Sequence, residues 1–245
     1  MRIAFHSDAD GYLSAYFVSS NDDVLIPVNL KDKDSVSCDI SLDITIKGAF
    51  SIDHHSGEST IDTKPHSPCW SLSPDDEILR TLSFFTNLYD NGFFTEESIA
   101  VGKNLKFFGT NDRDKIGEII FNYKHVKVDV PSFTFKEVID GLFEIETKEH
   151  DFSITSYYAN SLHGIKSCYK FSSNRILFRS FDGTALKYAR QLNQNAQGHL
   201  NATSVSYNGV VNFVKEEGSI VNHPLEDFYN DNLKMIDSYY KFFTA

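Results

Sequence analysis

The chain has 245 residues, of which 41% are hydrophobic, and its formal net charge at pH 7 is −11. This length allows one large or two medium-sized domains whose cores need no disulfide or structural metal. The negative charge argues against binding along duplex nucleic acid, because that binding depends on Lys and Arg neutralising phosphates. It permits a small phosphorylated substrate that is held through metal ions.

Three cysteines, Cys38, Cys69 and Cys168, are odd in number and have no paired spacing. We therefore expect neither a disulfide framework nor a Cys-rich zinc site, and the composition fits a reducing cytosol. No apolar run approaches the ~20 residues of a bilayer-spanning helix, and the apolar start at residues 1–5 is too short for a signal peptide. The sequence thus predicts a cytoplasmic protein without membrane contacts.

The first third of the chain alternates short apolar strands with helical or polar stretches. Strands are predicted at residues 3–6, 24–28, 40–44 and 49–53, and a helix at residues 12–19. Such alternation favours βαβ units and predicts an α/β fold built on a doubly wound, mostly parallel sheet. In open sheets of this kind, ligands gather at the carboxyl ends of the strands.

The rest of the chain predicts further helices of the first domain and then a second, smaller domain. Helices are expected at residues 73–89, 95–107 and 135–149, and strands at 154–158, 166–171, 175–179 and 204–214. The expected domains are a metal-binding domain (1–125), a connector (126–150), a smaller α/β substrate-binding domain with a mixed sheet (151–222) and a C-terminal helix (223–245). The apolar spacing of that helix suits packing on the body of the protein or on the partner subunit of a homodimer.

Two clusters of metal-ligand residue types stand at predicted strand ends. His6, Asp8 and Asp10 are two residues apart, so extended backbone points their side chains to one side, and Gly11 then allows a tight turn. Asp53-His54-His55 follows an apolar strand and combines a hard carboxylate with borderline imidazoles, which suits Mn²⁺, Fe²⁺, Co²⁺ or Zn²⁺ better than Ca²⁺. The alternatives are a capping Asp at a solvated strand end and a polar loop with two surface histidines.

The two clusters together resemble the first and third motifs of the DHH phosphoesterase family. The resemblance implies two divalent metal ions, usually Mn²⁺, on a doubly wound sheet. The second motif of that family is an Asp at the end of the intervening strand, for which we prefer Asp39 and keep Asp43 as the competitor. The fourth is an Asp after a helical stretch, for which we prefer Asp112 and hold Asp114 in reserve.

The resemblance also implies a role for each residue. The expected metal ligands are His6, Asp8, Asp10, Asp39, His54 and Asp112. Asp53 would orient a histidine, and His55 would contact the scissile phosphate. Arg113, between two acids, is either a phosphate clamp or a member of a surface ion pair.

A patch in the second half resembles the substrate-binding domain that accompanies the DHH domain in nano-RNase-like members. Arg179 and Ser180 end a predicted strand, and Gly198 and His199 stand where those members have a glycine-rich loop. Two of the expected glycines are absent before Gly198, which reduces the approach of backbone to a phosphate. The alternative is that Arg179 forms a salt bridge at a strand end and His199 belongs to a turn.

These observations predict a two-metal hydrolase of short oligonucleotides or of a nucleotide phosphate. Two other functions stay open: a pyrophosphatase or polyphosphatase, and an inactive family member that binds nucleotides or serves as a protein scaffold. Trp70, in a polar loop, is interpreted as a core anchor, with stacking on a base as the alternative.

Overall fold

The computed structural model describes residues 1–55, 57–105, 109–122, 128–207, 209, 211–215 and 224–243. The chain forms two compact units. The first unit comprises residues 1–90, 96–127 and 224–245, and the second comprises residues 91–95 and 128–223. Among the described helices, none is both long and apolar enough to cross a membrane.

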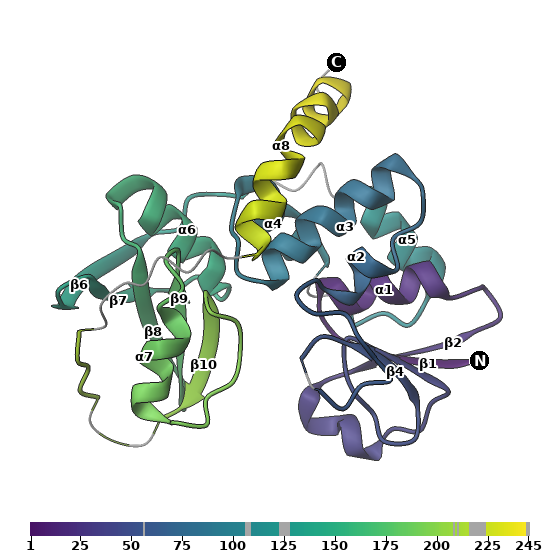
Figure 1. Cartoon of the computed structure of the whole chain (residues 1–245), viewed down its shortest axis with the longest axis horizontal. Coiled ribbons are helices and arrows are strands. Elements are labelled where there is room, and N and C mark those ends of the chain that lie inside the picture. Colours follow the sequence, from purple (N-terminus) through teal and green to yellow (C-terminus); the bar gives the residue numbers. More distant parts are fainter. Residues whose placement is uncertain are drawn as a thin grey trace. The chain divides into compact units, whose positions relative to one another are not determined.

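The first unit is built on a five-stranded sheet in which every pairing is parallel (Figure 1). Its order is β2-β1-β3-β4-β5. The strands are β1 (Arg2–His6), β2 (Val24–Val28), β3 (Ile40–Leu42), β4 (Phe50–Asp53) and β5 (Ile61–Asp62). The predicted α/β class and parallel sheet are therefore confirmed, and the predicted strand positions agree with β1 to β4 to within two residues.

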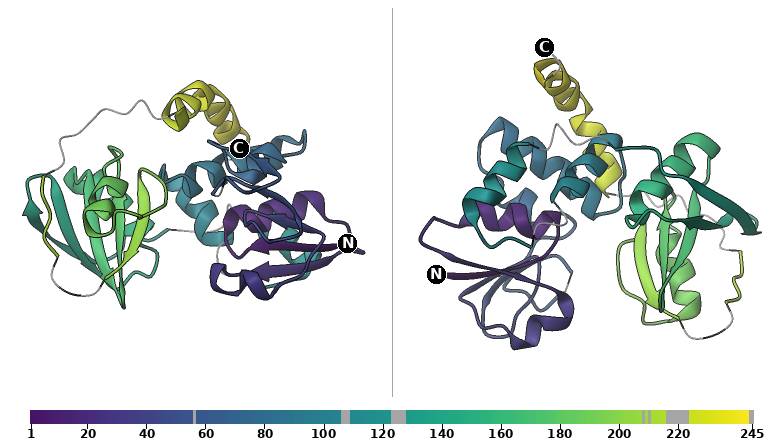
Figure 2. Two further views of the ribbon diagram at one scale, coloured as in Figure 1. Left: turned by 60° about the horizontal axis from the view of Figure 1, so that its bottom comes forward. Right: turned by 180° about the vertical axis from the view of Figure 1, so that it is seen from behind.

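Helix α1 (Ala9–Val18) lies against β1 and β3, and the other helices of this layer pack around it (Figures 1 and 2). They are α2 (Pro68–Ser71), α3 (Glu77–Asp90), α4 (Glu96–Leu105) and α5 (Arg113–Phe121). A short 3-10 helix, η1 (Leu30–Ser35), joins β2 to β3, and α8 (Pro224–Phe243) returns to this unit and packs on α3. Tyr12 and Leu13 of α1 are fully buried between sheet and helices. This packing fixes the start of α1 over the end of β1.

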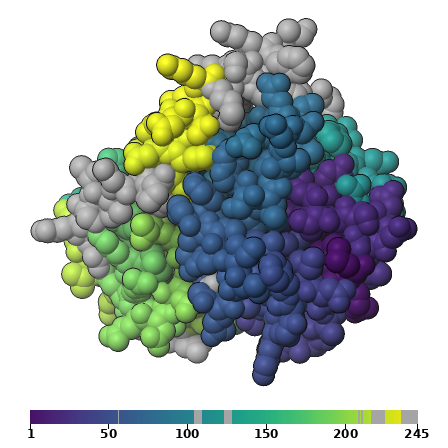
Figure 3. Space-filling view, turned by 45° about the vertical axis from the view of Figure 1, so that its right-hand side comes forward, coloured from purple at the N-terminus to yellow at the C-terminus, as the bar shows by residue number. Residues whose placement is uncertain are grey.

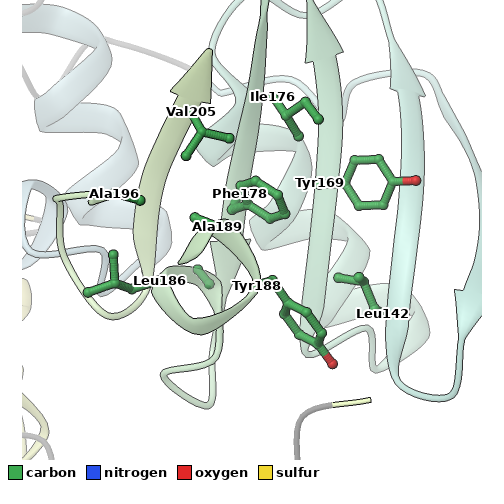
Figure 4. Packing of buried hydrophobic residues seen from close by; sticks show 10 residues of the cluster. Leu142, Tyr169, Ile176, Phe178, Leu186, Tyr188, Ala189, Ala196 and Val205 are labelled. Carbon is green, nitrogen blue, oxygen red and sulfur yellow. The ribbon is translucent and has the colours of Figure 1, made fainter. Parts of the chain in front are cut away.

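The second unit has a mixed five-stranded sheet in the order β10-β9-β8-β7-β6, with β7 and β8 parallel and the other pairs antiparallel. Its elements are β6 (Phe133–Ile139), β7 (Leu142–Thr147), α6 (Phe152–His163), β8 (Ser167–Ser172), β9 (Arg175–Ser180), α7 (Ala185–Leu192) and β10 (Ala202–Ser206). Because side chains alternate along a strand, Tyr169 packs with α7 (Figure 4), while its neighbour Cys168 packs with α6. Both faces of this sheet are thus covered.

Two secondary-structure predictions in this unit are wrong. Residues 135–149 were expected to be helical, but they contribute to the β6–β7 hairpin, whose turn contains Gly141 at φ +87°. The Asp140-Gly141 pair is a strong hairpin signal that outweighed the helical spacing. Residues 154–158 were expected to be a strand, but they lie in α6, which Asp151 caps by accepting from the Ser153 amide. Much of the predicted connector therefore belongs to the second sheet.

Candidate metal centre

The acidic and imidazole side chains come together where the strands of the first unit end. His6 is the last residue of β1, Asp43 follows β3, and Asp53 is the last residue of β4. These three strands are parallel neighbours, so their carboxyl ends lie at one edge of the sheet. The position of the site follows directly from the topology.

The turn from β1 into α1 places Asp8 and Asp10. Asp8 is the N-cap of α1, and its Oδ1 accepts a hydrogen bond from the Gly11 amide at 3.0 Å. A Cβ at Gly11 would overlap the carbonyl oxygen of His6, so only glycine permits this close approach. Asp10 is 1% exposed, and its Oδ1 accepts from the Cys69 amide at 2.7 Å and from Ser14 Oγ at 3.2 Å. The orientation of Asp10 is therefore held by α1 and by α2.

Asp43 is the centre of the arrangement. Its backbone has φ +57°, a left-handed conformation that Asp tolerates better than most residues, and its side chain is fully buried. The described part of the first unit contains three overlapping groups of possible metal ligands, and Asp43 belongs to all three. Within each group, the ligand atoms lie within 4.8 Å of one another. The groups are His6, Asp8 and Asp43; Asp10, Asp43 and His54; and Asp43, Asp53 and His55.

The two histidines of the Asp53-His54-His55 tripeptide contact different sets of carboxylates. His54 is buried, and its Nε2 lies 3.3 Å from Asp43 Oδ1 and 3.0 Å from Oδ2 of Asp90, the last residue of α3. His55 is 42% exposed in its side chain, and both its amide (2.9 Å) and its Nδ1 (3.0 Å) contact Oδ1 of Asp53. The other oxygen of Asp53 accepts from Thr45 Oγ1 at 2.8 Å. Asp53 thus contacts His55 through both the amide and the ring, and its predicted role of orienting a histidine for catalysis stays a prediction.

The acidic and imidazole side chains of the cluster strongly shift one another's pKa values. The charge of Asp8 raises the pKa of His6 to about 11. Burial opposes protonation of His54 and His55, but the neighbouring carboxylates outweigh burial and raise their pKa values to about 11 and about 12. Burial also opposes ionisation of Asp43, yet its contacts with the histidines hold its pKa well below the ordinary range. Without a cation, the site therefore holds protons at neutral pH.

The donor set fits divalent cations. Three buried carboxylate oxygens accept no hydrogen bond from the described residues: both oxygens of Asp43 and Oδ2 of Asp10. The histidine nitrogens that approach Asp43 at 3.3–3.4 Å are within ion-pair range but are not aligned as hydrogen bonds. Burial raises the pKa of Asp10, and the nearby charge of Asp43 raises it further. Buried carboxylates that repel one another and aim lone pairs into a shared space are stabilised by metal ions.

Two predicted ligands lie elsewhere. Asp39 precedes β3, at the amino end of the sheet, where its Oδ2 accepts from the Arg2 amide at 2.8 Å. Four residues of extended chain, about 13 Å at roughly 3.3 Å each, separate it from Asp43. Asp112 is exposed and caps α5 by accepting from the amides of Asp114 and Lys115. The structure therefore places the competitor Asp43 in the cluster and leaves Asp39, Asp112 and Asp114 outside the groups found among the described residues.

Sequence reasoning missed Asp90. It ends α3, and its Oδ2 lies 3.0 Å from His54 Nε2. The sequence did contain a signal, because Asp90 follows the helix predicted at residues 73–89 and is thus also an acid after a helical stretch.

Arg113 has a structural role in the described first unit. Its Nε donates to the Ser19 carbonyl at 2.9 Å, and its guanidinium lies 4.5 Å from the centre of the Tyr16 ring. These contacts join the start of α5 to the end of α1. They favour neither the phosphate clamp nor the surface ion pair that were considered from the sequence.

The four predicted substrate-binding residues belong to the second unit, where the structure shows local contacts. Arg179 Nε donates to Ser153 Oγ at 3.1 Å, and Ser180 Oγ accepts from the Ala185 amide at the start of α7 at 3.0 Å. Gly198 has φ +138°, and His199 exchanges backbone hydrogen bonds with Ala202 in a tight turn. Their contact with a substrate remains a prediction.

Comparison with known proteins gives distant structural similarity only. No family model matches the sequence, and no curated protein matches it. The chain is similar to an exopolyphosphatase-related protein from Bacteroides fragilis, with 14% identity and a TM-score of 0.43 over 86% of this chain and 87% of that one. It is also similar to RecJ from Thermus thermophilus in complex with Mn²⁺, with 11% identity and a TM-score of 0.43 over 84% of this chain and 49% of RecJ. The chain thus spans about half the length of RecJ.

A third similar structure is an uncharacterized protein from Helicobacter pylori, with 11% identity and a TM-score of 0.28 over 94% of this chain and 97% of that one. At these identities and TM-scores, the similarity does not assign a function, so the assignment below is based on the residues of the site.

Proposed function

We propose that the protein is a divalent-metal-dependent phosphoesterase of the DHH kind, which hydrolyses short oligonucleotides or nucleotide phosphates. The observation that carries this proposal is the convergence of His6, Asp8, Asp10, Asp43, Asp53, His54, His55 and Asp90 at one edge of the sheet. These residues come from separate segments of the chain. A structural explanation for so many buried acids and imidazoles in one place is poor, because their desolvation is costly without cations.

The geometry of the cluster suggests which of its residues bind metal. We propose His6, Asp8, Asp10, Asp43, His54 and Asp90 as the ligands of two metal ions, with Asp43 shared between them because it belongs to each of the three groups described above for the first unit. Divalent ions bound there would supply a nucleophilic water near neutral pH and positive charge for the transition state. We propose Mn²⁺ as the metal, since mixed carboxylate and imidazole ligands suit it.

His55 is the residue best placed to meet a substrate. Its side chain is the most exposed of the three histidines, at 42%. Asp53 holds its Nδ1, so Nε2 is the ring nitrogen that would donate to a phosphate oxygen. Arg179, Ser180, Gly198 and His199 are proposed to bind the far end of the substrate.

The proposal is tested by metal analysis of the purified protein and by hydrolysis of a substrate panel with Mn²⁺. The panel contains ribodinucleotides, a nucleoside 3′,5′-bisphosphate, pyrophosphate and polyphosphate. We expect Mn²⁺-dependent release of mononucleotides or phosphate, which Asp10→Ala abolishes and the matched variant Asp112→Ala leaves unchanged. A protein that binds no divalent metal would contradict the proposal, whereas one that binds metal and nucleotides without hydrolysis would be the inactive sensor or scaffold.

A further inference from the structure

The C-terminal helix α8 packs against the first unit, next to the segment that holds Asp10. Leu225 is fully buried, and the ring of Phe228 packs against three other rings. Its centroid is 5.0 Å from that of His66, 4.8 Å from that of Trp70 and 5.2 Å from that of Phe84. Figure 3 shows this helix, in yellow, lying against the blue surface of the segment that contains α2 and α3. Phe228 therefore bridges α3 and the chain around α2.

The chain around α2 is also the chain that fixes Asp10. The Cys69 amide donates to Asp10 Oδ1 at 2.7 Å. Two residues earlier, the Ser67 amide donates to Asn87 Oδ1 on α3 at 2.7 Å. This second hydrogen bond sets the distance between α3 and the segment, and so the direction from which the Cys69 amide reaches Asp10.

This segment has little stability of its own. α2 has only four residues, and a helix of one turn is not stable without tertiary contacts. The chain before it is polar and contains Pro65, and Pro68 is the first residue of α2. The packing that holds it therefore comes from α1, from α3 and from the rings around Phe228.

Because of these contacts, we propose that α8 is a positioning element of the metal centre. Phe228 holds His66 and Trp70 in place, this packing holds the Cys69 amide in place, and the amide keeps one oxygen of Asp10 occupied so that the other faces the cluster. This inference rests on the proposed function. It adds a residue from the opposite end of the sequence to the determinants of metal affinity.

Trp70 is the single tryptophan of the chain, so its fluorescence reports on the contact with Phe228. The experiment measures two quantities in the full-length protein: the Trp70 emission maximum in the metal-free state, and the Mn²⁺ dissociation constant by calorimetry. Phe228→Ala removes the ring. Leu233→Ala is the matched control, because Leu233 is on the same helix and 39% exposed.

We expect Phe228→Ala to shift Trp70 emission to longer wavelength and to raise the Mn²⁺ dissociation constant about tenfold, the lower range for groups that orient a ligand. Leu233→Ala should change neither quantity. Phe228→Leu keeps the apolar volume without the ring contacts, so its dissociation constant should lie between those of the wild type and Phe228→Ala. If Phe228→Ala does not fold, Phe228→Leu decides alone: a raised constant supports the proposal, and a wild-type constant refutes it.

A shifted emission with an unchanged dissociation constant would overturn the proposal, because the helix contact would then be lost without effect on the metal centre. An unchanged emission in Phe228→Ala would overturn it too, since the contact itself would be absent. A wild-type protein that binds no Mn²⁺ would instead refute the proposed function. The two failures are therefore distinguishable.

Discussion

Replacing Asp43 with Asn should weaken metal binding strongly, whereas the same change at Asp39 should not. Asp43 is buried, lies 3.3–3.4 Å from nitrogens of His6, His54 and His55, and belongs to each of the three ligand groups of the first unit. Asp39 is exposed at the opposite end of β3. The two residues have the same chemistry and differ in position alone, so they form a matched pair.

The size of the effect follows from linkage between binding and folding. At a Mn²⁺ concentration 100 times the wild-type dissociation constant, binding adds about 2.7 kcal/mol to the free energy of unfolding. For a protein of this size, that raises the melting temperature by about 5–11 °C. Mutation of a residue that only orients a metal ligand already lowers metal affinity about 10- to 100-fold. Loss of a ligand shared by two metal ions should therefore weaken Mn²⁺ binding on the order of 100-fold or more. At the same Mn²⁺ concentration, Asp43→Asn would then gain about 0.4 kcal/mol, or about 1 °C.

The assay is thermal unfolding followed by Trp70 fluorescence, with and without Mn²⁺. Trp70 lies in the first unit, so it reports on the unit that contains the metal centre. We expect the Mn²⁺-dependent shift to persist in Asp39→Asn and to fall to about 1 °C or less in Asp43→Asn. A full shift in Asp43→Asn, or its loss in Asp39→Asn, would refute the placement of the metal centre.

Three further outcomes are expected. Mn²⁺ affinity should rise with pH between 6 and 8. His6 and His54 have pKa values raised to about 11, so both are protonated in the metal-free protein and must each release a proton to bind the metal. Calorimetry in buffers of different ionisation enthalpy should count at least two released protons, and a pH-independent affinity would contradict this prediction. Thr45→Val should lower turnover about tenfold with little change in Mn²⁺ affinity, because it removes the hydroxyl that donates to Asp53 Oδ2. Thr45→Ser keeps the hydroxyl and should restore turnover. Equal kinetics of Thr45→Val and wild type would show that the hydroxyl is unimportant. Gly11→Ala should lower the melting temperature measurably even without metal, since its Cβ would overlap the His6 carbonyl; an unchanged melting curve would mean that the turn adapts.

The sequence determined the parts of the site that depend on local geometry. His6 ends β1 as predicted, and the apolar residues before Asp53 predict a strand that ends there. The extended backbone expected as far as Asp10 is wrong, because Asp8 caps α1 and Asp10 lies in its first turn. Parallel strands bring such ends to one edge. The α/β class, the parallel sheet and the position of the cluster could therefore be predicted without the structure.

Tertiary structure alone decided which of two similar acids completes the site. Asp39 and Asp43 both flank β3, and only the direction of that strand in the sheet and the left-handed backbone at Asp43 bring the second acid to the histidines. Asp90 arrives through the packing of α3 on α1, which depends on side-chain fit between helices. A local pattern fixes the strand end and the face that a side chain occupies, but the meeting of distant elements depends on the register and packing of the whole unit, which no short segment encodes.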